Sequence, residues 1–203
     1  TQDSSSAASD VYKRQFSDNG FQRLLMIASV GCCVGMSTPQ VHIIPLCIDQ
    51  GLSIITGGKI LSIMLFCAVL SRIMFGYISD IIGPLKTLLI GSTLQMITLI
   101  LFIPFNTLTG LYVVSILFGL SQGGIVPSYA LIVKKYLPNK DAAERIGLII
   151  FFTIIGMSIG GWMSGKIYDY TNSYSLGFLN SILWNLLNVC LLYTSPSPRD
   201  EQS

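Results

Sequence analysis

Arg72 is the strongest candidate for chemistry in this sequence, because it lies within a long apolar stretch. Between Ile60 and Ser79 it is the only charged residue. A charge inside a membrane span costs at least about 2.5 kcal/mol, so it is expected to face a cavity or a partner. Its planar guanidinium can hold a carboxylate through two parallel hydrogen bonds. Two roles are therefore possible for Arg72. It binds an anion, or its side chain pairs with groups at the end of its helix or extends to the membrane surface.

Uncharged polar residues in other apolar stretches are further candidates for binding a solute. Gln122 lies near the middle of one stretch, and Gln40 and His42 lie together in another. Facing the interior of a helix bundle, the glutamines could hydrogen-bond a solute, or they could join helices to one another. Histidine changes charge near physiological pH, so His42 is either a proton-linked switch or an ordinary hydrogen-bonding group.

No metal site, cofactor site or catalytic group is predicted. The five cysteines show no CxxC spacing, and His42 is the only histidine, so no zinc ligand set can be assembled. An enzyme would need a nucleophile with a base, or clustered acidic residues and histidines, and neither pattern occurs. A net charge of +2 without a basic, aromatic stripe does not favour nucleic acid.

The composition predicts an all-α membrane protein in contact with the lipid bilayer. Hydrophobic residues make up 51% of the chain and charged residues 11%, against about 25% charged in soluble domains. Apolar runs of about 20 residues are long enough to cross a bilayer. Six transmembrane helices are expected, over residues 24–47, 54–79, 87–103, 111–133, 146–166 and 176–193.

A short polar elbow joins the second and third expected helices. It contains Gly76, Asp80, Gly83 and Lys86, between two stretches that are otherwise almost free of charge. Glycine and the following Pro84 favour a turn, so the elbow should lie at a water interface. Asp80 could cap a neighbouring helix and hold a gate shut through the helix dipole, or simply cap its own turn.

The spacing of Gly76, Asp80 and Gly83, with a basic residue nearby, resembles the short cytoplasmic-loop signature of the major facilitator superfamily. The resemblance implies twelve helices in two six-helix halves that transport a solute by alternating access. This chain resembles the carboxyl-terminal half, with the amino-terminal half missing. The basic residues that the family usually carries beside the aspartate and second glycine are replaced here, and only Lys86 remains.

Residues Val41–Pro45, followed by Asp49–Gly51, are similar to the seventh helix of the monocarboxylate-porter and oxalate/formate-exchanger branch. That resemblance implies a small organic anion as solute, bound by Arg72, with a proton or counter-anion as coupled ion. The branch has an aspartate one turn before the arginine, where this chain has Ala68. The alternative is a stand-alone six-helix membrane protein, either a channel subunit or a membrane enzyme, and a second six-helix repeat upstream would exclude it.

Lysine and arginine bias predicts the orientation of the helices. Seven of these residues fall toward the elbow side and only Lys59 and Lys166 toward the other. The elbow is therefore expected on the cytoplasmic side, in the cytoplasmic membrane of a prokaryote. Small faces for close helix packing are expected at three glycine pairs, namely Gly119 with Gly123, Gly156 with Gly160, and Gly161 with Gly165.

Both ends of the sequence resemble translated sequencing-library adapters. Residues 5–15 and 190–200 match such translations along their length. The expected division is therefore an adapter-derived, disordered segment over residues 1–15, a transporter half over residues 16–189, and an adapter-derived tail over residues 190–203. The alternative is a serine-rich N-terminus and a proline-rich C-terminal tail.

Overall fold

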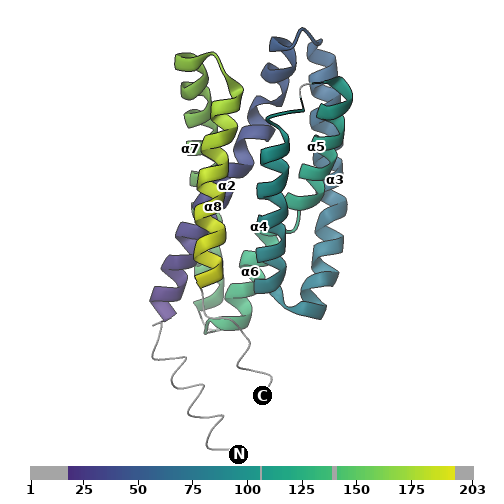
Figure 1. Cartoon of the computed structure of the whole chain (residues 1–203). Coiled ribbons are helices and arrows are strands. Elements are labelled where there is room, and N and C mark those ends of the chain that lie inside the picture. The colour runs from purple at the N-terminus through teal and green to yellow at the C-terminus, as the bar shows by residue number, and fades with distance from the viewer. Residues whose placement is uncertain (1–17, 106, 139–140, 195–203) are drawn as a thin grey trace, which may run out of the picture.

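The structure is a bundle of long helices, all running up or down along one direction (Figure 1). A computed structural model describes residues 18–105, 107–138 and 141–194. Six stretches of these residues are long and apolar enough to cross a membrane. The helices are α2 (Asp18–Asp49), α3 (Ile54–Ile82), α4 (Pro84–Leu101), α5 (Leu108–Gln122), α6 (Ile125–Tyr136), α7 (Ala142–Thr171) and α8 (Tyr174–Thr194).

The elbow between α3 and α4 is shorter than the sequence predicts. Helix α3 continues through Asp80 to Ile82, and α4 begins at Pro84, so Gly83 alone makes the turn. Gly83 has φ 89°, a backbone conformation that glycine adopts without a steric penalty. Proline is favoured in the first turn of a helix, because its missing N–H would have no partner there.

The fourth span, expected as one helix over residues 111–133, is broken between α5 and α6. The break falls at Gly123 and Gly124, which have poor helix propensity. Pro127 lacks the N–H that would bond to the Gly123 carbonyl, and its ring would clash with that carbonyl in a regular helix. The fourth span therefore consists of two helical pieces, and together they extend over Leu108–Tyr136.

The outer boundaries also differ from those expected. Helix α2 begins at Asp18, α7 covers Ala142–Thr171, and α8 continues to Thr194. Residues 190–193 are apolar and simply continue α8, so the proposed boundary at residue 190 does not end this helix. The proposed adapter segments otherwise fall largely on residues 1–17 and 195–203, outside the described part of the chain.

Helix packing divides the bundle into buried and peripheral helices. In their most apolar stretches, 67% of α2 is buried but only 28% of α3 and 22% of α7. Helix α2, the first span, packs mainly on α7 and α8, the fifth and sixth spans. Helix α3, the second span, packs mainly on α5 in the fourth span. The exposed faces of α3 and α7 are apolar, and therefore need lipid or another polypeptide to cover them.

Glycines bring the helix backbones together at two of these contacts. A Cβ atom at Gly119 of α5, or at Gly123 just after it, would lie 2.2 or 2.1 Å from a carbonyl oxygen of α3. A Cβ atom at Gly156 of α7 would lie 2.7 Å from the Val30 carbonyl oxygen, and one at Gly160 would lie 2.2 Å from Ser37 Oγ. At Gly161 and Gly165 an added Cβ would meet only ordinary contacts, near Val41 and His42.

Candidate functional site

Gln40 and Gln122 meet between α2 and α5, although 82 residues separate them in sequence. Gln40 Nε2 donates a hydrogen bond of 2.7 Å to Gln122 Oε1. Gln122 is only 3% exposed, and its own Nε2 donor has no partner among the described residues. A buried amide donor without a partner is costly, so this N–H group is available to an acceptor such as a carboxylate.

Arg72 lies at a similar depth but on a different surface. It is exposed on α3, about 15 Å along the helix from Ile82 at 1.5 Å per residue. The preceding residue, Ser71, donates a hydrogen bond of 2.5 Å to the Leu120 carbonyl and contacts Gly123, next to Gln122. Within the described part of the chain, no hydrogen bond or ion pair joins Arg72 to another residue.

Ala68, one turn before Arg72, is packed against the break in the fourth span. A Cβ atom at Gly123 would lie 2.1 Å from the Ala68 carbonyl oxygen, and Ala68 is 6% exposed. The side chain at position 68 is nearly buried, so an aspartate there would lose most of its contact with water.

His42 belongs to a polar cluster at the other end of the bundle from the elbow. Its Nε2 lies 3.0 Å from the Gly161 carbonyl oxygen of α7, and its ring centroid is 5.8 Å from that of Tyr174. Tyr174 stacks on Tyr168 with centroids 4.2 Å apart, and the Tyr168 hydroxyl donates to the Asp49 carboxylate. The structure therefore joins His42 to α7 and α8 rather than to Arg72.

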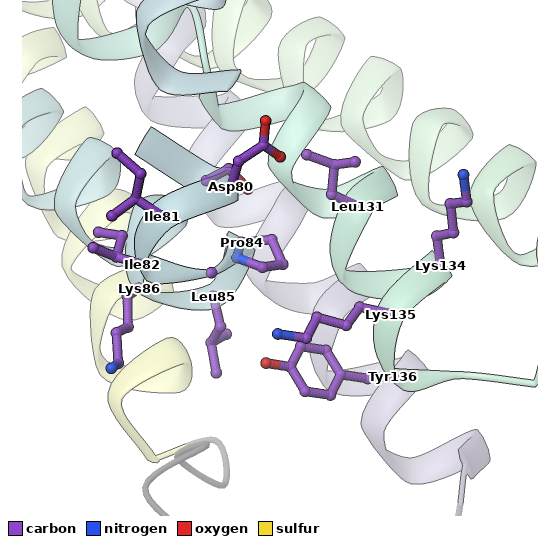
Figure 2. Close-up of a pocket in the computed structure, with 12 residues that line it drawn as sticks. Asp80, Ile81, Ile82, Pro84, Leu85, Lys86, Leu131, Lys134, Lys135 and Tyr136 are labelled. Atoms are coloured by element: carbon purple, nitrogen blue, oxygen red, sulfur yellow. The ribbon is translucent and has the colours of Figure 1, made fainter. Parts of the chain in front are cut away.

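The elbow residues lie together at the opposite end. Asp80 is in the last turn of α3, Lys86 is in the first turn of α4, and both are exposed. Asp80 makes no hydrogen bond or ion pair with another described residue. Gly76 is exposed on α3, where an added Cβ would meet nothing within 4 Å. Asp80, Gly83 and Lys86, but not Gly76, line a pocket shared with the end of α6 (Figure 2).

A buried polar network around α8 was not predicted from the sequence. The Tyr129 hydroxyl donates to Asn188 Oδ1 at 2.8 Å, and Asn188 Nδ2 donates to Ser92 Oγ at 2.9 Å. Asn185 Nδ2 donates to the Ser92 carbonyl at 3.0 Å. The spacing of two asparagines three residues apart in an apolar run was the available signal, since it places both on one helix face.

A second missed cluster joins three helices through hydroxyl groups. Thr38 Oγ1 of α2 lies 2.5 Å from Ser164 Oγ of α7 and also 2.5 Å from Ser181 Oγ of α8. Gln95 of α4 donates to the Cys32 carbonyl of α2 at 3.1 Å. These satisfied groups hold helices together, whereas Arg72 and Gln122 retain unused donors.

Metal binding has no candidate among the described residues, because no group of three or more histidine, cysteine or acidic side chains comes together there. The described cysteines are all free thiols. What remains is a set of hydrogen-bond donors at the depth of the α5–α6 break, within a bundle of six apolar spans. These features define a polytopic α-helical membrane protein.

Comparison with known proteins then gives the family. Residues 24–203 match the family model of the Major Facilitator Superfamily. The fold is similar to the crystal structure of the POT family transporter PepTSo, with a TM-score of 0.73 at 14% identity, over 85% of this chain and 36% of that chain. The chain belongs to the Major Facilitator Superfamily, and the similarity predicted at the elbow is confirmed at the level of the family.

Curated relatives include transporters with anion-related names. Monocarboxylate transporter 13 of Rattus norvegicus is 24% identical over 164 residues, or 80% of this chain and 38% of that protein. The MFS-type transporter opdF of Penicillium oxalicum is 26% identical over 160 residues, or 75% and 38%. Probable anion transporter 5 of Arabidopsis thaliana is 26% identical over 149 residues, or 71% and 34%. The chain therefore spans less than two fifths of the length of these relatives.

Proposed function

We propose that this chain is the carboxyl-terminal six-helix half of a secondary transporter that moves a small organic anion, such as a monocarboxylate, by alternating access. The solute would cross without any chemical reaction. The amino-terminal half would cover the exposed face of α7 and that of α3 up to its last turn, and would form the other wall of the solute cavity. A coupled proton or counter-anion is part of this proposal.

Arg72 carries the proposal. Its guanidinium is exposed well inside a membrane span, and no described residue neutralises it. A carboxylate of the solute would supply the missing negative charge, and the fork of the guanidinium would orient it. The names of the monocarboxylate and anion transporters among the relatives support the same solute class.

Gln122 and Gln40 would offer hydrogen bonds to the solute at another point of its path, because they lie on a different surface from Arg72. The free Nε2 donor of Gln122 lies next to the α5–α6 break. Ser71, the neighbour of Arg72, bonds to Leu120 of α5, so Arg72 and Gln122 lie at a similar depth. Gln40 holds the Gln122 carbonyl oxygen, which orients the amide donor. His42 would act near the opposite end of the pathway, where its proton could be exchanged with the solution on that side.

Uptake measurements with the whole protein that carries this segment test the proposal. Arg72→Gln is expected to lower uptake of a labelled monocarboxylate by about ten- to a hundred-fold, because a charged hydrogen bond is lost. Arg72→Lys keeps the charge but not the fork, and should recover part of the activity. Arg23→Gln, the same change at an exposed site near the start of α2, is the matched control.

Normal uptake by Arg72→Gln, at wild-type amounts in the membrane, would refute the assigned role of Arg72. Saturable uptake of a neutral solute in preference to any carboxylate would refute the solute class.

For the orientation in the membrane, we propose that the elbow is cytoplasmic, since the lysines and arginines gather at that end of the bundle.

A further inference from the structure

The elbow and the end of α6 enclose a hollow that the proposed transport function does not use. Its volume is about 590 Å³, within the range of ligand pockets. Asp80, Lys86 and the turn at Gly83 form one side, and Lys134 and Lys135 of α6 form the other (Figure 2). Arg72 is absent from its lining, so this site is separate from the proposed solute site.

Three lysines from two elements give this hollow a positive charge. Lys86 belongs to α4, while Lys134 and Lys135 belong to the last turn of α6. In the described part of the chain none of them forms an ion pair with a carboxylate. Asp80 is the one acidic residue of the lining, so the lining carries a formal net charge of +2, from three lysines and one aspartate.

Lys135 is the lysine that reaches furthest toward the turn. Its Nζ lies 3.8 Å from the position that a Cβ would take at Gly83. In Figure 2 its side chain extends over the elbow, whereas the Asp80 carboxylate points away from the Lys135 and Lys86 ammonium groups. The start of α4 adds to the positive field, because no side chain caps it. Lys134 points the other way in Figure 2, so an anionic group would find Lys135 and Lys86 without first displacing the aspartate.

Apolar walls distinguish this hollow from a site for a soluble anion. Ile81 is 65% exposed and Leu131 is 40% exposed, and both line the hollow beside the lysines. It opens at the end of membrane-spanning helices, where headgroups meet acyl chains. A free phosphate would bind the lysines and leave these apolar side chains uncovered. A phospholipid would cover both parts of the surface.

We propose that this hollow binds the phosphate of an anionic phospholipid from the leaflet on the elbow side. Lys135 and Lys86 donate hydrogen bonds to the phosphate oxygens, Lys134 adds positive charge at the edge of the hollow, and an acyl chain lies against Ile81 and Leu131. Basic pockets between membrane helices are established sites for anionic headgroups. The bound lipid bridges the α3–α4 elbow and the end of α6, two elements that belong to different spans. This assignment does not depend on the identity of the solute.

Lipid binding to the purified full-length protein tests the inference. Native mass spectrometry would count lipids retained after addition of phosphatidylglycerol, or of phosphatidylcholine with the same acyl chains. The wild type is expected to retain phosphatidylglycerol preferentially. The double variant Lys134→Gln, Lys135→Gln should bind it at least about ten-fold more weakly, since each lysine near a membrane surface contributes about five-fold.

The matched control removes two lysines from the opposite end of the bundle. Lys59→Gln, Lys166→Gln should retain phosphatidylglycerol like the wild type, and Lys135→Arg should retain it as well because the charge is kept. Each variant is first compared with the wild type by its melting temperature without added lipid. A preparation of the double glutamine variant that has lost its fold would be replaced by Lys134→Arg, Lys135→Gln.

Three outcomes would overturn the proposal. The first is equal retention of phosphatidylcholine and phosphatidylglycerol, and the second is equal loss in the control variant. The third is that millimolar inorganic phosphate displaces phosphatidylglycerol and that Ile81→Ser leaves lipid retention unchanged. This result would identify a site for soluble phosphate. If Ile81→Ser retains less lipid and phosphate does not compete, the results would support a phospholipid as the ligand.

Discussion

Gln122 shows how a single side chain can be poised for a ligand. Its carbonyl oxygen is held by Gln40, while its amide nitrogen is buried without a partner among the described residues. Gln95 has the same side chain but uses it within the bundle, with its amide donating to Cys32. The two glutamines therefore form a natural comparison between a binding role and a structural role.

Replacing each glutamine by leucine should separate these roles. Gln122→Leu is expected to raise the KM for the solute by about five-fold, because one neutral hydrogen bond is lost. Gln95→Leu should instead lower the melting temperature and leave the KM unchanged. Uptake kinetics and thermal melting of both variants provide the measurement. An unchanged KM in Gln122→Leu would remove Gln122 from the proposed site.

Gln40 and Gln122 are recognisable in the sequence as polar groups at membrane depth, but their pairing is not. The hydrogen bond joins helices separated by two other spans, so it depends on the fold rather than on local spacing. The same limit explains His42. Its contact with Gly161 and Tyr174 follows from the packing of α2 on α7 and α8, which no local pattern encodes.

At the scale of the helices, close glycine contacts should dominate the stability of the bundle. Gly123→Ala is expected to destabilise the protein by about 1–3 kcal/mol, because the new methyl group would overlap the Ala68 carbonyl oxygen. Gly58→Ala is the control, since nothing lies within 4 Å of its added Cβ. Thermal melting in detergent provides the comparison, and equal melting temperatures for the two variants would contradict it.

The asparagines of α8 allow a test of the buried polar network. Asn188→Leu would leave the Tyr129 hydroxyl without its acceptor, and Tyr129→Phe would remove that hydroxyl. In a double-mutant cycle the pair should show a coupling energy of about 0.6–2 kcal/mol, the range for hydrogen bonds between membrane helices. Additive losses in stability would show that the Tyr129–Asn188 bond contributes nothing of its own.

Element boundaries were predictable to different degrees. The sequence predicted six spans, because each apolar run is long enough to cross a bilayer. It did not predict that α3 would continue through Asp80, since Asp80 and Gly83 together suggested a longer loop. It also missed the α5–α6 break, because two glycines and a proline interrupt hydrogen bonding without changing the hydropathy of the run.

For the whole molecule, the end that carries the elbow should face the cytoplasm. By the bounds of the helices, that end carries Arg23, Lys86, Lys134, Lys135 and Arg145, and the other end carries Lys59 and Lys166. In a background with the native cysteines replaced by alanine, Lys59→Cys should react with an impermeant maleimide in intact cells. Lys86→Cys should react only after permeabilisation. The reverse pattern would invert the proposed orientation.

The described chain crosses the bundle six times, so α2 begins and α8 ends at the end that carries the elbow (Figure 1). An even number of crossings has a consequence for evolution by gene duplication. Two such units fused in tandem can be connected by a linker that stays on one side of the bilayer, and both copies then insert in the same orientation. A unit with an odd number of crossings would insert its second copy upside down.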